Sequence, residues 1–477
     1  MPDYDLLVLG GGTGNAVAAA AADAGLDTGL VERGRLGGTC LNRGCNPSKK
    51  LIHRADVAES IRHAGELGID ASLDGVAFSD IVDDVAEAIT AKAERMAREA
   101  RERDGLTLYH AEGRFVDERT VEVERDDGRN GDGDDDGDGG TERLTAETVV
   151  LAGGSRPMVP DSIDGTDETS FLTSDEALWL DSLPDRLVVV GGGYIAVELS
   201  HFFSQMGSDV AIVGHGDVLV DREDRDVAER LTEAYREKHD LHLGYRATEI
   251  ADVDGERVVT AEPEEGETIE VRGDRLLLAT GRRPNGDLWN VDAAGIETTE
   301  KGFVETDEYL RTSVDGVYAM GDIAGNYMFK HSGDKEAEYV VANAVRGDER
   351  AVEYPGMAHA VFGSPQVASL GKTESEVSER DGTDYEVGTC AYDDTALGAA
   401  LRDEGGFAKA IVGADGEVLG CHVVGPEAST VIHEVSTAVA AGADAETIAE
   451  TIHVHPAISE VVQGAFRDAC GVGLSGI

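Results

Sequence analysis

The sequence predicts an α/β protein that contains two similar strand–turn–helix domains and a smaller C-terminal α+β domain. A buried strand, a glycine-rich turn and a helix follow one another near residue 10, and the same succession recurs near residue 190. From about residue 352 onward, short strands precede a further helix. The chain of 477 residues is long enough for three domains with substantial cores.

The charge of the chain is extreme. The formal net charge is −54 at pH 7, and nine lysines stand beside 32 arginines. At molar salt the Debye length falls to about 3 Å, which largely removes the self-repulsion of such a surface. We therefore interpret the composition as the solvated acidic surface of a halophilic protein. We expect neither nucleic acid nor an anionic membrane as a partner.

The start of the chain bears on its location. No apolar run approaches the length of a transmembrane segment, and the first residues lead directly into a strand. This start leaves no room for a signal peptide, so we expect a cytoplasmic protein. In that compartment a close pair of cysteines is more plausibly catalytic than structural.

The first unit comprises a strand over residues 5–9, an alanine-rich helix to residue 24 and a strand over residues 26–32. Its turn carries Gly10, Gly12 and Gly14. Glycines permit a tight turn, the helix N-terminus then faces a pyrophosphate, and Glu32 would bind a ribose hydroxyl. The pattern predicts a Rossmann-like dinucleotide-binding domain. Asn15 takes the third glycine position, so we expect the helix and strand to pack slightly wider there.

Two cysteines, Cys40 and Cys45, follow this unit and precede a helix that we expect to open at Pro-Ser-Lys. A dithiol spaced in this way can close a small disulfide. A thiolate near a helix N-terminus is favoured by the helix dipole and by cations such as Lys49. Two alternatives are ordinary buried cysteines and half of a zinc site, but no second ligand pair is evident and we expect no metal. We expect the remaining cysteines to be inert: Cys390, Cys421 and Cys470.

Residues 126–140 form an acidic, glycine-rich insert of low complexity. The start of a calcium-binding EF-hand loop is matched by Asp132, Asp134, Asp136 and Gly137. The acid that should end such a loop is replaced by Arg143, and no flanking helix pair is evident. We therefore expect a disordered hairpin tip.

The second unit shows a strand over residues 187–190, the glycines Gly191 and Gly193, and a second strand over residues 209–213. A repeated strand–glycine–helix unit indicates two dinucleotides. The first motif is followed at once by a cysteine pair, which indicates FAD, and the second motif then accommodates a nicotinamide nucleotide.

With these motifs in this order, the chain resembles the flavin-dependent pyridine-nucleotide disulfide oxidoreductases along nearly its whole length. That group includes glutathione, mycothione and mercuric reductases and dihydrolipoamide dehydrogenase. The resemblance implies an FAD-binding domain over residues 1–157 and 281–351, an NAD(P)-binding domain over 158–280, and a dimerisation domain over 352–477.

The resemblance also assigns cofactor residues beyond the first turn. Asp322, in the family's second FAD motif, would bind the ribityl chain. Lys49 would pair with Glu198 near the flavin, and Tyr194 would gate the nicotinamide. Further residues at matching cofactor-binding positions are Gly38, Thr39, Gly153, Gly281 and Arg282.

The identity of the nicotinamide nucleotide depends on the end of the strand over residues 209–213. An NAD enzyme should carry an acid there, but Gly214 and His215 follow, with Arg222 nearby. No carboxylate would repel a 2′-phosphate, so we favour NADPH over NADH. The arginine expected just before His215 in NADP-specific relatives is missing.

His455 is followed by proline and, five residues on, by Glu460. A carboxylate can hold an imidazole and raise its basicity, and the spacing matches the family's acid/base pair. We expect a plain helix surface at His433-Glu434 and an incidental pairing at Cys421-His422.

The family's mechanism passes hydride from the nicotinamide to FAD and on to the Cys40–Cys45 disulfide. Cys40 would then be the exposed thiol that attacks the substrate disulfide, and Cys45 the charge-transfer thiolate. His455 would protonate the departing thiol. It would reach the disulfide of the other subunit, so we expect a homodimer.

Three activities compete within the family. Mercuric reductase normally has a C-terminal cysteine pair, and dihydrolipoamide dehydrogenase prefers NAD with an acid at position 214. A reductase of a low-molecular-weight disulfide fits best. Mycothione reductases are similar at the position of Asn15, and Lys330-His331 in the helix after Asp322 also supports this activity. In a halophile we expect bis-γ-glutamylcystine. Basic residues that could meet its carboxylates are Arg43, Lys50, His53 and Arg54.

A different class, a non-catalytic flavoprotein subunit or binding module, is the remaining alternative. Retention of both cysteines together with His455 and Glu460 disfavours it.

Overall fold

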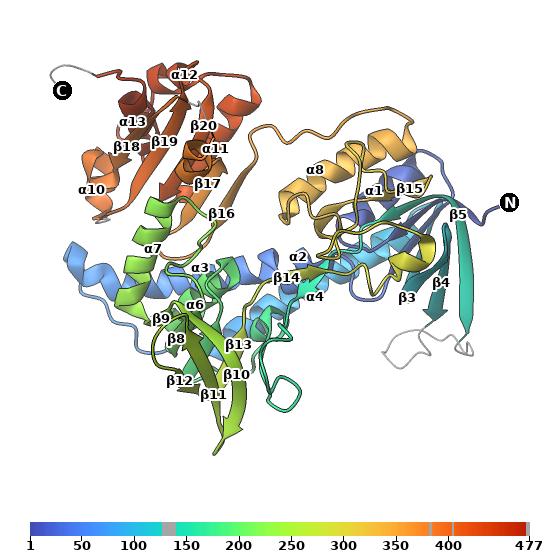
Figure 1. The fold of residues 1–477 in the computed structure, drawn as a ribbon, viewed down its shortest axis with the longest axis horizontal. Helices are drawn as coiled ribbons and strands as arrows, with labels where there is room; N and C mark the ends of the chain where they lie inside the picture. The colour runs from blue at the N-terminus through green and yellow to red at the C-terminus, as the bar shows by residue number, and fades with distance from the viewer. Residues whose placement is uncertain (126–139, 381–383, 403–404, 474–477) are drawn as a thin grey trace. The chain divides into compact units, whose positions relative to one another are not determined.

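The computed structural model describes residues 1–125, 140–380, 384–402 and 405–473 (Figure 1). The chain divides into two compact units. Unit 1 comprises Met1–Ser48, Val82–Met158 and Arg282–Tyr354, and unit 2 comprises Lys49–Ile81, Val159–Gly281 and Pro355–Ile477. The division into domains inferred from the sequence stays a prediction. The EF-hand-like residues Asp132 to Gly137 lie outside the described residues.

Unit 1 is built on a sheet whose parallel strands lie in the order β3, β2, β1, β5, β15. The distal parts of β3 and β5 pair with β4 in antiparallel fashion. The strands are β1 Tyr4–Leu9, β2 Thr28–Glu32, β3 Leu106–Asp117, β4 Thr120–Arg125, β5 Thr141–Leu151 and β15 Val317–Ala319. A small ribbon joins β6 Ser155–Pro157 to β14 Arg282–Pro284.

The central strand β1 is buried on both faces, as expected for a parallel sheet covered on two sides. Leu6 and Val8 pack with the helix α1, Gly14–Asp23, whereas Leu7 and Leu9 pack into a second cluster with Phe115. Further helices of unit 1 are α2 Gly38–Arg43 and α8 Lys330–Val340. The residues of α3, Cys45–His63, and α4, Phe78–Glu102, are divided between the two units.

Unit 2 contains a second parallel sheet, in the order β13, β7, β8, β9. Its strands are β13 Arg275–Leu278, β7 Arg186–Val190, β8 Asp209–Gly214 and β9 Asp240–Leu243, and its helices are α6 Tyr194–Met206 and α7 Arg225–Lys238. An antiparallel sheet that the sequence analysis did not predict follows: β10 Tyr245–Val253, β11 Glu256–Pro263 and β12 Ile269–Gly273.

The C-terminal part of unit 2 is an antiparallel sheet in the order β16, β17, β20, β19, β18 (Figure 1, orange and red). The strands are β16 Ala358–Val361, β17 Val367–Gly371, β18 Tyr385–Ala391, β19 Phe407–Gly413 and β20 Val418–Val424. Its helices are α11 Ala428–Ala440, α12 Ala445–Glu450 and α13 Glu460–Ala469; short helices of unit 2 are α5 Ser174–Ala177, α9 Glu374–Ser378 and α10 Ala396–Leu401. α11, α12 and α13 share one apolar core with this sheet.

This architecture confirms the predicted α/β class with two dinucleotide-binding folds and a C-terminal α+β domain. Within the described ranges, no helix combines the length and the apolar character that crossing a membrane requires.

Candidate active site

The first glycine turn and the cysteine segment lie against each other in unit 1. The backbone N–H of Gly37 donates to the carbonyl of Gly11 at 2.8 Å. A Cβ on Gly38, whose φ is +58°, would come within 2.7 Å of the Cα of Gly12. Side chains are therefore excluded at this contact, which places the start of α2 beside the turn.

Glu32 lies at the end of β2 and holds the turn. Its carboxylate accepts hydrogen bonds of 2.7 Å from the backbone N–H groups of Gly11 and Gly34. Gly10 has a φ of +106°, and a Cβ there would meet the carbonyl oxygen of Ala152 at 2.2 Å. This turn presents glycine backbone at the N-terminus of α1, so the residues present fit the phosphates and a ribose of FAD.

The wider packing that we expected at Asn15 stays a prediction, whereas the neighbouring Gly14 lies close to the strand. A Cβ on Gly14 would come within 2.8 Å of the Val8 side chain and 2.9 Å of the Ala152 side chain. Gly14 therefore supplies the close helix–strand contact of this motif.

Cys40 lies in α2, together with Thr39, and Cys45 is the first residue of α3. The second helix therefore begins two residues before Pro47, where we had expected it to open. Both cysteines are thiols in the structure, with Cys40 half-buried and Cys45 exposed. The predicted roles suggest that Cys40 is the more exposed thiol and that Cys45 lies against the flavin. In the protein chain without flavin, Cys45 is the more exposed of the two.

The two thiols share a hydrogen bond. This bond with Cys45, and burial after it, raise the pKa of Cys40 well above its ordinary value. A second thiolate beside the first is therefore disfavoured. The position of Cys45 at a helix N-terminus makes it the better place for the one negative charge. The assignment of the attacking thiol to Cys40 stays a prediction.

The second expected FAD segment gathers Asp322, Ser155 and Arg282 in unit 1. Ser155 donates its hydroxyl hydrogen to Asp322, and Arg282 donates to the Ser155 hydroxyl and carbonyl oxygens at 2.8 Å each. Gly153 accepts a hydrogen bond of 2.9 Å from Asn285, and a Cβ there would clash with the indole of Trp289.

Glu336 of α8 belongs to the same region and was missed from the sequence. It is fully buried and accepts hydrogen bonds of 2.5 Å from the backbone N–H of Gly321 and from the hydroxyl of Tyr354. Burial raises the pKa of its carboxyl group. One of two glutamates in a polar helix gives no sequence signal for such a position.

The second glycine turn repeats the first. Gly191 has a φ of +134°, and a Cβ there would meet the carbonyl oxygen of Ala279 at 2.3 Å. A Cβ on Gly193 would have no atom within 4 Å, so the space before the start of α6 is open. Gly281, with a φ of +106°, lies where the chain leaves unit 2.

The strand register makes the two turns comparable residue by residue. Leu9 pairs with Val31 beside the first turn, and Val190 pairs with Val213 beside the second. Gly214 therefore takes the place that Glu32 has in unit 1. His215 and Arg222, the residues expected to meet a 2′-phosphate, are exposed.

Lys49 and Glu198 form the pair that the family resemblance predicted. The ammonium nitrogen of Lys49 lies 2.6 Å from a carboxylate oxygen of Glu198, which is 8% exposed. The other oxygen accepts a 3.1 Å hydrogen bond from the backbone N–H of Phe362, whose ring lies under Lys49 at 4.7 Å.

His455 and Glu460 also lie together. The Nδ1 atom of His455 is 2.9 Å from Glu460, which accepts a second 2.9 Å hydrogen bond from the backbone N–H of Ala457. The backbone bond first, and His455 second, hold the pKa of Glu460 below its ordinary value. The imidazole of His455 is 70% exposed.

A second histidine–glutamate pair lies beside the first. His453 is 2.5 Å from Glu434 through Nε2 and 2.9 Å from the carbonyl of Thr451 through Nδ1. The expected plain helix surface at His433-Glu434 is therefore wrong for Glu434, whereas His433 is exposed. Two histidines separated by one residue were the signal that could have indicated this pair.

Other expectations concern isolated side chains. His422 is buried and lies 3.0 Å from the hydroxyl of Ser369 and 2.9 Å from the carbonyl of Lys372, so its contacts are structural, which agrees with an incidental Cys421-His422 pairing. Burial raises the pKa of Cys421 to about 12 and that of Cys390 to about 11. These raised values favour inert thiols.

Comparison with known proteins identifies the class. Residues 4–345 match the family described as pyridine nucleotide-disulphide oxidoreductase, and residues 357–466 match the dimerisation domain of the same family. The chain belongs to the pyridine nucleotide-disulphide oxidoreductases. Within that class it is an NAD(P)H-dependent flavoprotein disulfide reductase with Cys40 and Cys45 as its redox pair.

The similar proteins cover nearly the whole chain. Dihydrolipoyl dehydrogenase 3 of Haloarcula marismortui is 38% identical over 98% of this chain and 96% of its own. Mycothione reductase of Mycobacterium tuberculosis is 35% identical over 98% and 99%. The Cu(II) complex of the HOCl-induced flavoprotein disulfide reductase RclA from Escherichia coli has a TM-score of 0.85 at 25% identity, covering 98% of this chain and 99% of that one.

Proposed function

We propose that the protein is an NADPH-dependent reductase of a low-molecular-weight disulfide. The observation that supports this choice most is Gly214 at the place that Glu32 takes beside the first turn. A carboxylate there would favour a ribose diol and repel a 2′-phosphate. The exposed side chains of Arg222, a cation, and His215, a hydrogen-bond donor, favour the phosphate instead.

The substrate that we propose is bis-γ-glutamylcystine, a disulfide with several carboxylates. A protein with a net charge of −54 has to offset its own field where such a substrate binds. Helix α3, which begins at Cys45, carries Lys50 and His53 on its exposed surface and Arg54 half-buried. The similarity to a mycothione reductase supports a small thiol disulfide.

The residues of the chain would divide the reaction as follows. Bound FAD would supply the transfer of an electron pair from the nicotinamide to the Cys40–Cys45 disulfide, which gives the reduced pair. His455 of the partner subunit would take the proton of the Cys40 thiol; the Cys40 sulfur would attack one sulfur of the substrate, and the other sulfur would leave as a thiol that receives this proton from His455. The Cys45 thiolate would then attack the Cys40 sulfur, which restores the disulfide and releases the second substrate sulfur as a thiolate that takes a proton from solvent.

This division requires two copies of the chain. The dimerisation domain supports a homodimer. The loop between α12 and α13 also carries the apolar side chains Ile452 and Val454, which are 96% and 76% exposed. A two-fold interface that buries them would bring the His455 loop against the partner.

The second candidate is dihydrolipoamide dehydrogenase. It is favoured by the 38% identity to dihydrolipoyl dehydrogenase 3 of Haloarcula marismortui. That activity would require NAD and a lipoyl substrate, and the glycine at position 214 argues against the first of these.

Steady-state assays in molar KCl separate the two candidates. NADPH with bis-γ-glutamylcystine should give a higher kcat/KM than NADPH with glutathione disulfide or lipoamide. Faster turnover of dihydrolipoamide with NAD than of any γ-glutamyl disulfide would contradict the proposal. Arg54→Ala should raise the KM for the disulfide more than it lowers kcat. Arg101→Ala, which removes an exposed arginine from the last turn of α4, is the matched control.

A further inference from the structure

A buried carboxylate, Glu223, lies at the centre of a polar cluster in unit 2 that the sequence analysis did not predict. Glu223 is 5% exposed and stands two residues before α7. It accepts a hydrogen bond of 2.5 Å from the hydroxyl of Ser369 and lies 2.9 Å from Nε2 of His359. The hydroxyl of Tyr194 also donates to it.

These contacts fix Glu223. Burial opposes its charge, but the hydrogen bonds from His359, Ser369 and Tyr194 outweigh burial and hold the pKa of Glu223 below its ordinary value. A buried donor that loses its acceptor costs about 1–3 kcal/mol. Each of the three partners therefore resists movement of the carboxylate.

Tyr194 is held on two sides at the second glycine turn. It is the first residue of α6 and follows Gly193, in front of which the space is open. Its hydroxyl is bound by Glu223, and its ring stacks on His359 with centroids 6.0 Å apart and an interplanar angle of 19°. Burial beside the charge of Glu223 raises the pKa of Tyr194, which keeps it a donor.

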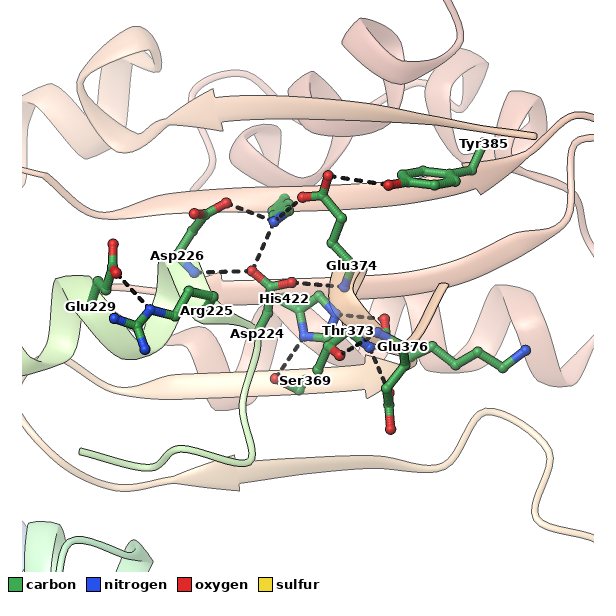
Figure 2. Close-up of polar contacts among 12 residues, drawn as sticks. Asp224, Arg225, Asp226, Glu229, Ser369, Thr373, Glu374, Glu376, Tyr385 and His422 are labelled. Carbon is green, nitrogen blue, oxygen red and sulfur yellow. Dashed lines mark hydrogen bonds and ion pairs between the residues drawn. The ribbon is translucent and has the colours of Figure 1, made fainter. Parts of the chain in front are cut away.

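The C-terminal sheet anchors this cluster. His359 lies on β16 and Ser369 on β17. The residue after Glu223, Asp224, accepts hydrogen bonds of 2.9 Å from Lys409 and 3.0 Å from the backbone N–H of Glu374 (Figure 2). The segment is therefore tied to the C-terminal part of unit 2 at Glu223 and at the residue that follows it.

We propose that Glu223 is a positioning residue for the nicotinamide nucleotide. Glu223 holds the Tyr194 ring, and this ring forms a wall of the nucleotide site at the second glycine turn. The inference rests on nucleotide binding at this turn, as the proposed function requires. Glu223 itself lies behind Tyr194 and acts through it. His359 and Ser369 keep the carboxylate in place, so the C-terminal sheet contributes to the geometry of a site formed by another part of the chain.

Without the hydrogen bond to Glu223, the Tyr194 ring is free to move, and nucleotide binding then has to order it. Immobilising one such side chain costs enough to weaken binding about three- to tenfold. We therefore expect Glu223→Gln and Tyr194→Phe each to raise the apparent Kd for NADPH by about three- to tenfold. Because both changes break the same bond, the double variant should be no worse than the worse single variant.

The experiment is stopped-flow reduction of the flavin by NADPH, with the reoxidation of dithionite-reduced enzyme by the disulfide as the second readout. The first reaction should be impaired in the variants and the second unchanged. Glu434→Gln is the matched control, because Glu434 also pairs with a histidine, His453, and takes no part in holding Tyr194 or Glu223. It should leave the Kd for NADPH unchanged.

Several results would overturn the inference. These are an unchanged or lowered Kd in Tyr194→Phe, independent effects that add in the double variant, or the same loss in Glu434→Gln. Tyr194→Phe keeps the ring and removes one hydroxyl, so it decides the question even if Glu223→Gln does not fold. A wild-type flavin that neither NADPH nor NADH reduces would instead overturn the proposed function, and the inference with it.

Discussion

At the scale of single residues, the acid–base role that we propose for His455 depends on how Glu460 holds its imidazole. The pKa of Glu460 is lowered by the backbone N–H of Ala457 and by His455. A carboxylate of lowered pKa is charged from about pH 5 upward, and its interaction is lost only as the pH falls through the lowered value. Glu460 therefore stays charged over the whole range in which a histidine titrates.

Replacing Glu460 with Gln should lower kcat about tenfold, because a neutral amide no longer stabilises the imidazolium of His455. Glu434→Gln is the control, because it alters the neighbouring pair with His453 and should leave kcat nearly unchanged. An unchanged kcat in Glu460→Gln would show that this carboxylate does not support the proposed role of His455.

Buried charge at single positions could not be predicted from the sequence. Lys409 is 2% exposed and lies 2.9 Å from Asp224, 2.6 Å from Asp226 and 2.6 Å from Glu374. In a strand, a lysine normally indicates a solvent-facing position. Its partners come from segments far away in the sequence, so only the folded chain brings them together (Figure 2).

Lys409→Met should destabilise the protein by about 3–5 kcal/mol, because the buried carboxylate of Asp224 loses its cation. Denaturant titration at constant molar salt measures the change. Arg225→Gln is the matched control. It breaks ion pairs in which the arginine is 52% exposed, and should cost about 1 kcal/mol or less. Equal effects of the two changes would mean that burial does not strengthen the Lys409 cluster.

At the scale of secondary-structure elements, the strand–glycine–helix units could be predicted, because each combines an apolar strand with a glycine, Gly10 or Gly191, at which a Cβ would clash with the backbone. β1, α1 and β2 lie where the sequence placed them, and so do β7, α6 and β8. The sheet of β10, β11 and β12 could not be predicted in the same way. Its strands are interrupted by exposed acidic residues, and its burial is decided by packing against the parallel sheet.

The end of β8 provides the element-scale test. Gly214→Glu should lower the ratio of kcat/KM for NADPH over NADH at least tenfold, or about 1.4 kcal/mol, because a carboxylate would face the 2′-phosphate. A Cβ at position 214 would come within 2.9 Å of the Leu243 side chain. Gly214→Ala therefore controls for packing and should keep the wild-type preference. Equal use of both nucleotides by the wild type would count against the assignment.

At the scale of the whole molecule, two features act in opposite directions on dimerisation. The net charge of −54 opposes it, and the exposed apolar side chains of Ile452 and Val454 favour it. Charge repulsion between copies extends over about 10 Å at 0.1 M salt and over about 3 Å at 1 M. Apolar burial at the loop favours association. Molar salt should therefore favour the dimer.

Val454→Asp should convert the dimer into monomers in sedimentation experiments at molar KCl, because it places a charge in the proposed apolar interface. The monomers should retain flavin reduction by NADPH and lose disulfide reduction, since His455 of the partner subunit is then absent. Val57→Asp changes a half-exposed valine on α3 and is the control. Monomers that reduce the disulfide at the wild-type rate would exclude a shared site.

The most direct test of the account is the flavin spectrum of two cysteine variants. If Cys40 is the attacking thiol and Cys45 the thiolate beside the flavin, Cys40→Ser should show a long-wavelength charge-transfer band without any reductant. Cys45→Ser should lack this band even after addition of NADPH. A flavin spectrum that neither substitution alters would contradict the roles assigned to the two cysteines.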